Sequence, residues 1–466
     1  MHDVYLDTSE QAVADGTADV VSVATSSYAA TGLELGKTYF WRVDEVNDAG
    51  VPPIWEGDVW NFKTLDYLVV DDFETYNDDW ENYNRIFQVW IDGAGYTTPE
   101  PGNPGNGSGA LVGTSAAPWV ERTIVHGGKQ SMPLSYNNAT VAISEATRTL
   151  PGEDWTAGGI KSLSLWFYGD PDNTGQLYVK INNAEVRYDG GADDIKRGQW
   201  LPWNIDLSDP AIGGNASNVT SLTVGVRGAG AKGMLYIDDI RLYPKMPELL
   251  TPVEPAKTGL LAEYLFDNGA NDTSGKGHHG TFLGDAYVAN SRLFLDGTDD
   301  AVFIPRLGGA TATHANCTYS MWMYSDTEPP NPGFIGGINY DNWAEGGGIH
   351  CKIRNAVANV GVSGVPGGDL NGTTIVGSDE WFHLGLTVTD DEVTLFLNGQ
   401  VEDSRSFTGP VEMVLGRGCI GAYRDNNVIE RELRGQMDDV RIYNRVVSLE
   451  EMLWLAGRQE PAHKPF

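Results

Sequence analysis

The fold class is decided by the stretch WFHLGLTVTDDEVTLFLNG, residues 381–399. Its two apolar runs, Trp381–Val388 and Val393–Leu397, are rich in the β-branched and aromatic residues of short strands. The dipeptide Asn398-Gly399 follows directly and favours the tight turn of a β-hairpin. The stretch therefore predicts antiparallel strands joined by short turns.

The rest of the sequence extends this pattern in both directions. Its 57 Gly and 23 Pro supply turns, and its 14 Trp and 20 Tyr suit strands. Leu449–Leu455 is the single stretch with a helical pattern, with Ser448 as its N-cap. No apolar run approaches about 18 residues, so a transmembrane helix is not expected. We predict an all-β, multidomain protein built from β-sandwiches.

Length and charge limit the domain count and the partners. The 466 residues suggest about three domains. With 31 Lys and Arg against 64 Asp and Glu, the net charge is −33, which disfavours nucleic acids and anionic membrane surfaces. The same carboxylates suit hard cations such as Ca²⁺, which take oxygen ligands.

Cysteines and the chain start say little about the cellular compartment. Cys317, Cys351 and Cys419 allow at most one disulfide and match no zinc motif. We expect them to be buried as small apolar side chains. The opening segment Met1–Asp7 is polar and lacks the apolar core of a signal peptide.

Residues 1–66 read as short strands and turns. The run Leu33–Val43 resembles the second half of a fibronectin type III sandwich, and Tyr39 occupies the place of that family's corner tyrosine. A complete sandwich of this type has about 100 residues. We therefore expect that its first two strands are missing and that the chain begins inside a domain of a longer parent protein.

Residues 67–246 are the second predicted domain. Val70–Glu74, His126–Ser131 and Tyr236–Ile240 resemble the galactose-binding-like jelly roll of many carbohydrate-binding modules. The resemblance implies a structural calcium ion between the first and last strands, where distant carboxylates converge. The implied ligands are Glu74 with Asp72 as the rival, carbonyl groups around Gly128 and Lys129, and Asp239 or Asp238.

A proline-rich linker, residues 247–257, leads to a third predicted domain at 258–457 and a tail at 458–466. Six stretches carry the third resemblance: Gly259–Asp267, Asp272–Thr281, Leu295–Asp300, Glu380–His383, Leu397–Gly399 and Gly435–Arg445. They resemble a laminin-G-like, concanavalin A-like jelly roll. The resemblance implies calcium near the rim, with Asp272, Asp296 and Asp438 as ligands and Asp439 as the alternative to Asp438.

Candidate sugar platforms are aromatic residues in loop-like sequence, because carbohydrate modules stack sugar rings on exposed aromatic side chains. These candidates are Trp80, Trp90, Tyr96, Trp119, Tyr340, Trp343 and Tyr423. The tryptophans in strand-like patterns are expected in the core: Trp155, Trp166, Trp200 and Trp203. A loop tryptophan also often serves as a lid over a core, so both roles stay open for each candidate.

Candidate catalytic residues form no complete constellation. Glu430 and Glu432 would share one face of a strand, but flanking arginines favour surface pairing. His278 and His279 would suit a metal site or, alternatively, a structural turn. A nucleophile elbow with a triad, a His-Glu-x-x-His run and a phosphate-binding loop do not occur in the sequence.

We therefore predict a secreted or cell-surface, calcium-stabilised carbohydrate-binding module. It would belong to a larger bacterial polysaccharide-processing or surface protein, with Ca²⁺ as cofactor and a polysaccharide or glycan as partner. Neither nucleic-acid binding nor membrane insertion is expected. The alternatives are a metal-dependent hydrolase, acting on glycosidic, ester or phosphoester bonds, and an adhesion protein.

Overall fold

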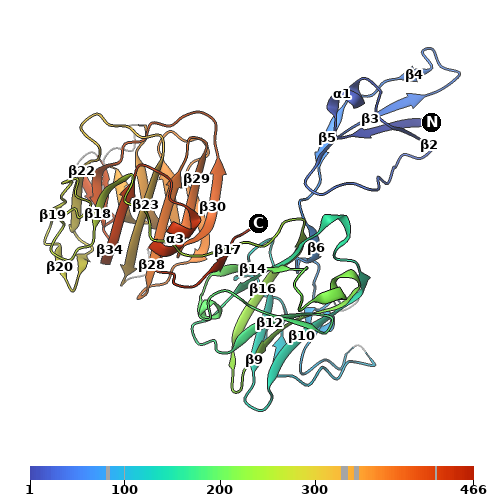
Figure 1. Cartoon of the computed structure of the whole chain (residues 1–466), viewed down its shortest axis with the longest axis horizontal. Helices are drawn as coiled ribbons and strands as arrows, with labels where there is room; N and C mark the ends of the chain where they lie inside the picture. The colour runs from blue at the N-terminus through green and yellow to red at the C-terminus, as the bar shows by residue number, and fades with distance from the viewer. Residues whose placement is uncertain (80–83, 99, 327–333, 341–345, 426–427) are drawn as a thin grey trace. The chain divides into compact units, whose positions relative to one another are not determined.

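The computed structural model describes residues 1–79, 84–98, 100–326, 334–340, 346–425 and 428–466. The chain divides into two compact units: unit 1 is Met1–Glu248 with His463–Phe466, and unit 2 is Leu249–Ala462. Figure 1 labels strands and helices of both units. Strands dominate both units, which confirms the all-β prediction. Within the described residues, no helix is long and apolar enough to cross a membrane. The finer domain boundaries, such as the one after residue 66, stay predictions.

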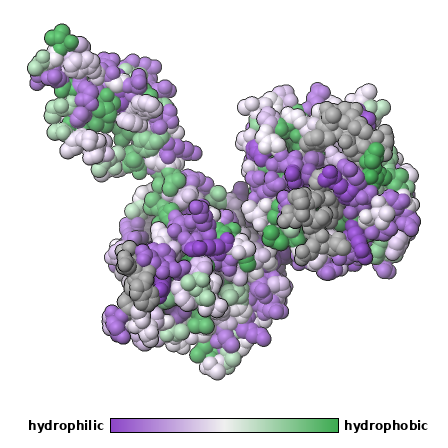
Figure 2. All heavy atoms as spheres, turned by 180° about the vertical axis from the view of Figure 1, so that it is seen from behind, coloured by the Kyte–Doolittle hydropathy of each residue, from purple (hydrophilic) through white to green (hydrophobic). Residues whose placement is uncertain are grey.

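The first part of unit 1 is one antiparallel sheet with strand order β2-β1-β3-β4, in which β5 also pairs with β3. Its elements are β1 (His2–Asp7), α1 (Glu10–Ala14), β2 (Val20–Val23), β3 (Thr38–Val46), β4 (Ile54–Trp55) and β5 (Trp60–Lys63). Tyr39 Oη accepts a hydrogen bond from the Glu34 amide at 2.9 Å, the kind of bond a corner tyrosine makes. Figure 2 shows hydrophobic surface on this part, whose exposed apolar side chains include Val51 and Ile54.

The remainder of unit 1 is a two-sheet sandwich. The first sheet has the order β13-β12-β15-β10-β7; the second has the order β14-β11-β16-β9-β8, with β6 also on β16. The first sheet consists of β7 (Trp90–Ile91), β10 (Ile143–Glu153), β12 (Gln176–Ile181), β13 (Ala184–Arg187) and β15 (Val219–Arg227). The second consists of β6 (Leu68–Asp71), β8 (Ala110–Val112), β9 (Met132–Asn137), β11 (Ser162–Tyr168), β14 (Trp200–Asp206) and β16 (Lys232–Tyr243). The helical turns are α2 (Ile86–Val89), η1 (Ala157–Gly159), η2 (Asp194–Lys196) and η3 (Gly213–Ser217).

Side chains alternate between the two faces of a strand, and this alternation determines which strand tryptophans of this sandwich point into its core. Trp155 and Trp203 lie in its core, as expected. Trp166 and Trp200 do not: their strand neighbours Leu165, Phe167 and Leu201 point into the core, so these two rings lie on the opposite face of their sheet.

Unit 2 stacks an eight-stranded sheet on a seven-stranded one. The first has the order β20-β21-β34-β23-β28-β29-β30 with β18 on β34; the second has the order β19-β22-β31-β24-β25-β26-β27. The eight strands are β18 (Leu260–Tyr264), β20 (Tyr287–Ala289), β21 (Arg292–Asp296), β23 (Cys317–Ser325), β28 (Trp381–Val388), β29 (Glu392–Leu397), β30 (Gln400–Ser406) and β34 (Arg434–Tyr443). The seven are β19 (Thr281–Leu283), β22 (Ala301–Arg306), β24 (Phe334–Tyr340), β25 (Ile349–Arg354), β26 (Val357–Val362), β27 (Leu370–Ile375) and β31 (Gly416–Ile420).

Smaller elements complete unit 2. They are β17 (Leu249–Leu250) with β35 (Ala462–His463), the hairpin β32 (Tyr423–Asp425) with β33 (Val428–Glu430), and α3 (Leu449–Leu455). Ser448 caps α3 by accepting a hydrogen bond from the Glu451 amide, as predicted. Asn398 and Gly399 both have positive φ, 50° and 82°, which confirms the predicted tight hairpin turn between β29 and β30.

The core of unit 2 lies between its two sheets, where apolar side chains alternate inward along each strand. All three cysteines are buried and free, as expected. Helix α3 packs Met452 and Leu455 with Phe396 and Tyr443, on the outer side of the eight-stranded sheet. The ends of the strands and the outer sheet faces are therefore the places where a site can form.

Candidate functional site

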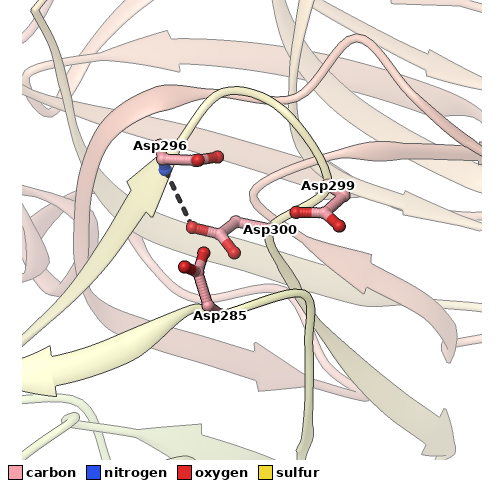
Figure 3. A group of neighbouring side chains, drawn as sticks. All are labelled: Asp285, Asp296, Asp299 and Asp300. Atoms are coloured by element: carbon pink, nitrogen blue, oxygen red, sulfur yellow. Dashed lines mark hydrogen bonds between the residues drawn. The ribbon is translucent and has the colours of Figure 1, made fainter.

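Four aspartates converge in the turns at one end of unit 2 (Figure 3). Asp296 ends β21, Asp299 and Asp300 precede β22, and Asp285 lies between β19 and β20. One carboxylate oxygen of each lies within 4.8 Å of the corresponding oxygens of the other three. We call this group the Asp cluster. Three of its members are exposed, whereas Asp300 is buried.

Asp300 is the buried member of the Asp cluster, and its carboxylate is only partly hydrogen-bonded. Its Oδ2 accepts a hydrogen bond from the Asp296 amide at 2.9 Å, the dashed line in Figure 3. Its Oδ1 is buried and has no hydrogen-bond partner in the described residues. Burial raises the pKa of Asp300 above its usual value. The backbone N–H groups of Asp296 and Asp285 lower this pKa in part, whereas the carboxylates of the same two residues raise it. A buried, incompletely bonded carboxylate is costly unless a proton or a cation neutralises it.

The donor set of the Asp cluster fits a hard cation, because every side-chain ligand atom offered is a carboxylate oxygen. The local backbone also makes room for this carboxylate: a Cβ at Gly284, where φ is 66°, would lie 2.5 Å from Asp300 Oδ1. Of the three ligands predicted for this domain, only Asp296 belongs to the cluster. Asp299 and Asp300 stand in the same Asp-Gly-Thr-Asp-Asp stretch, whereas Asp285 has no sequence signal that links it to them.

The other two predicted rim ligands lie elsewhere. The Asp272 carboxylate accepts hydrogen bonds from the amides of Glu263, Ser274 and His278 at 3.0, 2.9 and 2.9 Å. Burial raises the pKa of Asp272, but a hydrogen bond from the Ser274 side chain, together with the three amides, outweighs burial and holds this pKa below its usual value. Asp438 lies on β34, on the outer face of the eight-stranded sheet, with Asp439 beside it. The cation set carried over from the resemblance is thus divided among three places.

The predicted calcium ligands of unit 1 do come together around a tight turn. Glu74 Oε1 accepts hydrogen bonds from the amides of Lys129 and Gln130 at 2.7 and 2.8 Å. A Cβ at Gly128 would lie 2.4 Å from the same oxygen, and a Cβ at Gly127 would lie 2.5 Å from Asp239 Oδ2. The two carboxylates therefore flank the Gly127-Gly128 turn.

N–H donors already occupy most of these oxygens. Asp239 pairs with His126 Nδ1 at 2.6 Å and with Arg241 Nη2 at 2.5 Å. The neighbouring Asp238 accepts hydrogen bonds from the His126 and Gly127 amides at 2.9 and 3.2 Å. Burial, reinforced by Asp239, raises the pKa of Asp238 to about 8. A calcium ion here would compete with these partners, and the site stays a prediction.

Asp72 and the Lys129 carbonyl complete the predicted set. Asp72 Oδ1 accepts a hydrogen bond from the Glu74 amide at 3.2 Å. This bond is local to its own turn and leaves the choice between Asp72 and Glu74 open. Lys129 contributes its amide to Glu74 in this structure.

The predicted sugar platforms differ in their access to solvent. Trp90 is fully buried and donates from Nε1 to Asp71 Oδ2 at 2.8 Å, and Tyr340 is also buried; neither offers the open ring face that stacking needs. Tyr96 and Trp119 are half-buried and flank Phe87, with ring centroids 6.3 and 5.5 Å from it. Half-buried Tyr423 lies near His350, at 6.4 Å between ring centroids. Trp80 and Trp343 lie outside the described residues.

A charged network that the sequence did not suggest lies on the outer face of the seven-stranded sheet. Lys352 Nζ is 3.1 Å from Asp369 Oδ2 and 2.9 Å from His350 Nε2, which is itself 3.2 Å from Asp369 Oδ1. Burial lowers the pKa of both His350 and Lys352. Burial raises the pKa of Asp369, but these two neighbours outweigh it and hold the pKa far below its usual value. The network ties the segment before β27 to β25.

The weak catalytic candidates are not brought together. Glu430 is exposed and pairs with Arg431 at 3.3 Å, and Glu432 is half-buried. His278 Nδ1 lies 2.9 Å from the Leu261 carbonyl, and His279 Nδ1 accepts a hydrogen bond from the Asp272 amide at 3.2 Å. Both histidines thus hold a turn in place.

The stacked sheets and the Asp cluster define unit 2 as a β-sandwich of the jelly-roll class with a candidate cation site. Residues 296–452 match the family model described as the Concanavalin A-like lectin/glucanases superfamily. This part of the chain is a concanavalin A-like jelly-roll domain, which confirms that prediction. The fibronectin type III-like and galactose-binding-like resemblances stay predictions.

Several solved structures are similar to this chain. Domain 4 of AbnA, a GH43 extracellular arabinanase from Geobacillus stearothermophilus, in complex with arabinotriose, has 18% sequence identity and a TM-score of 0.35, and the match covers 45% of this chain and 100% of that one. The Ruminococcus gnavus IT-sialidase CBM40, bound to alpha2,3 sialyllactose, has 15% identity and a TM-score of 0.26, with coverage of 31% and 84%.

The botulinum neurotoxin serotype D binding domain has 15% identity and a TM-score of 0.35, with coverage of 43% and 52%. This chain therefore spans about half the length of that structure. A search of curated proteins finds no match.

Proposed function

We propose that the chain is a calcium-stabilised, extracellular carbohydrate-binding module of a larger polysaccharide-processing or surface protein. The observation that carries the proposal is the buried Asp300 Oδ1, which lacks a partner in the described residues, within the Asp cluster of a domain that matches a lectin-related family. The four aspartates would hold the ion through their carboxylates.

The proposed role of calcium is structural. The Asp cluster joins two turns, and each turn connects one sheet of unit 2 to the other. Asp285 lies between β19 and β20, and the other three aspartates lie between the start of the β21–β22 turn and β22; β20 and β21 belong to one sheet, β19 and β22 to the other. An ion bound there would neutralise the repulsion among the four carboxylates and hold the ends of both sheets together. An ion that binds only the folded state stabilises it by mass action.

Two measurements test the proposal. Differential scanning calorimetry of the full chain in calcium and in EDTA should show a higher Tm for unit 2 in calcium. A glycan array, probed in calcium and in EDTA, should show retention of the chain on oligosaccharides, and weaker retention after chelation. Equal melting in both buffers rejects the calcium site, and an array without any retained glycan rejects carbohydrate binding.

A further inference from the structure

The sheet β14-β11-β16 of unit 1 holds a cage of aromatic and acidic side chains on its outer face. Trp166 pairs across the sheet with Asp238, and Tyr168 pairs with Trp200. The rings of Tyr168 and Trp200 meet edge to face, with centroids 5.6 Å apart. We call these four residues the first cage.

The first cage is filled by a residue of its own unit. The imidazole ring of His126 stacks on Trp166 with centroids 3.9 Å apart and meets the edge of Trp200 at 5.8 Å. The His126 amide donates to Asp238 at 2.9 Å, and its Nδ1 lies 2.6 Å from Asp239 Oδ2. The cage therefore accepts a flat ring that carries hydrogen-bond donors.

Unit 2 repeats the same cage on the sheet β28-β23-β34. Trp322 pairs with Asp438, and Tyr324 pairs with Trp381, at the matching strand positions. The rings of Tyr324 and Trp381 have centroids 5.7 Å apart. The order of the strands along the chain and across the sheet is also the same. We call these residues the second cage.

The second cage is open where the first is filled. A hollow of about 270 Å³ is lined by Arg292, Trp322, Trp381, Asp438 and Asp439. In the described residues, the single hydrogen bond to the Asp438 carboxylate comes from the Asp439 amide to Oδ1, at 2.8 Å. The Oδ2 atom of Asp438 can therefore accept a hydrogen bond from a ligand. In unit 1 the corresponding oxygen, Asp238 Oδ2, accepts hydrogen bonds from the amides of His126 and Gly127. Arg292 lies over Trp381, with Cζ 5.0 Å from the ring centroid.

We propose that the second cage binds one uncharged pyranose ring of a glycan, an inference that rests on the proposed carbohydrate-binding function. The C–H face of the sugar would stack on Trp322, as His126 stacks on Trp166. A sugar hydroxyl would donate to Asp438 Oδ2, and Arg292 would donate to a sugar oxygen.

Size and charge define the ligand class. Pockets for drug-sized ligands span roughly 300–1,000 Å³, so a hollow of about 270 Å³ suits a single ring. The carboxylates of Asp438 and Asp439 repel uronic acids and sulfated sugars. The guanidinium groups of Arg292 and Arg441, the latter 3.0 Å from Asp439, disfavour a cationic ligand. A neutral sugar is the class that remains.

The test uses the full chain on an array of neutral, uronic-acid and sulfated oligosaccharides, followed by titration calorimetry with the best neutral ligand. Trp381→Ala removes one wall of the second cage, and Asp438→Asn removes the acceptor charge with little change in shape. Each should weaken binding at least tenfold. The matched control is Trp60→Ala, which removes an exposed tryptophan of unit 1 and should bind like the wild type. Circular dichroism and melting check that each variant folds.

The outcomes separate the inference from the function on which it rests. If the wild type binds neutral glycans and both cage variants bind equally well, the cage assignment is wrong while carbohydrate binding stands. If the wild type retains charged oligosaccharides in preference to neutral ones, the neutral ligand class is wrong. If it retains no glycan, carbohydrate binding fails and the cage assignment fails with it.

Discussion

Asp300→Asn tests whether the Asp300 carboxylate binds a calcium ion or only supports its turn through a hydrogen bond. The amide oxygen can still accept the hydrogen bond from the Asp296 amide, so the turn should keep its shape. The substitution removes one of four clustered negative charges. In EDTA the variant should therefore be as stable as the wild type or slightly more stable, because like charges repel.

The expected size of the calcium effect follows from mass action. An ion at a hundred times its Kd stabilises the folded state by about 2.7 kcal/mol. For a unit of roughly 150–250 residues, each kcal/mol moves the Tm by about 2–4 °C. The wild-type Tm of unit 2 should thus rise by about 5–11 °C in saturating calcium, and this rise should disappear in Asp300→Asn.

Calorimetric melting across a calcium titration from about 0.1 to about 10 mM covers the Kd values of about 0.1–1 mM found in extracellular modules. Asp390→Asn removes an exposed aspartate elsewhere in unit 2 and should keep the full shift. The reasoning is refuted if Asp300→Asn keeps the calcium shift. It is also refuted if the variant is several kcal/mol less stable than the wild type in EDTA, because Asp300 would then stabilise the apo fold by itself.

Further predictions concern buried polar groups. Burial and the Arg441 guanidinium lower the pKa of His383 to about 3. Because the unfolded chain takes up this proton near pH 6.5, the free energy of unfolding of unit 2 should fall by about 2–3 kcal/mol between pH 6.5 and pH 4.5. Urea titrations at each pH should show that His383→Asn reduces this loss. Gly361→Ala places a Cβ 2.3 Å from Asp369 Oδ1 and should cost about 1–3 kcal/mol by chemical denaturation, whereas Gly346→Ala, with open space around it, should cost much less. Asp44→Ala removes the carboxylate that lies 2.9 Å from the guanidinium of buried Arg42. The substitution should destabilise the first sheet of unit 1 by about 3–5 kcal/mol, and limited proteolysis should cut that part of the chain earlier than in the wild type.

Local patterns in the sequence were enough to predict single elements. Asn398-Gly399 specified its turn because positive φ at two successive positions suits few other residue pairs. Ser448 specified the start of α3 because a hydroxyl at that position satisfies a free amide of the first helical turn. Both are contacts between residues close in sequence, so the chain alone carries the information.

The Asp cluster needed information that the sequence does not hold. Asp296 was predicted from a resemblance, and Asp299 and Asp300 follow it within four positions. Asp285 joins them because β20 pairs with β21 and so places the turn before β20 at the same end of the domain. The pairing of strands is a long-range property, and a list of acidic residues does not reveal which of them will converge.

The cage of unit 2 depends on one irregular strand. The residues of β34 that point into the core are Met437, Val440 and Ile442. Val440 and Ile442 are two positions apart, as in a regular strand, whereas Met437 and Val440 are three positions apart. The register against β23 shifts at the same point, and Asp439 has a φ of 52°, so the extra residue forms a β-bulge. Two successive aspartates can then both face outward. In a regular strand successive side chains point to opposite faces, so one of the two would point into the core; the extra residue of the bulge interrupts this alternation.

β16 of unit 1 follows the same spacing, with Ile237, Ile240 and Leu242 in the core and Asp239 at a φ of 50°. The sequence pattern of a bulged strand with an acidic outer face is therefore recognisable. It consists of an apolar residue, two aspartates, an apolar residue, an arginine and an apolar residue. What the pattern cannot specify is whether a loop covers that face. His126 covers it in one unit and a hollow lies over it in the other, although both strands carry the same pattern of two aspartates followed by an apolar residue and an arginine. The difference between a stabilised sheet and a binding site therefore lies in the loop, which has to be located in three dimensions before the aspartates can be assigned a function.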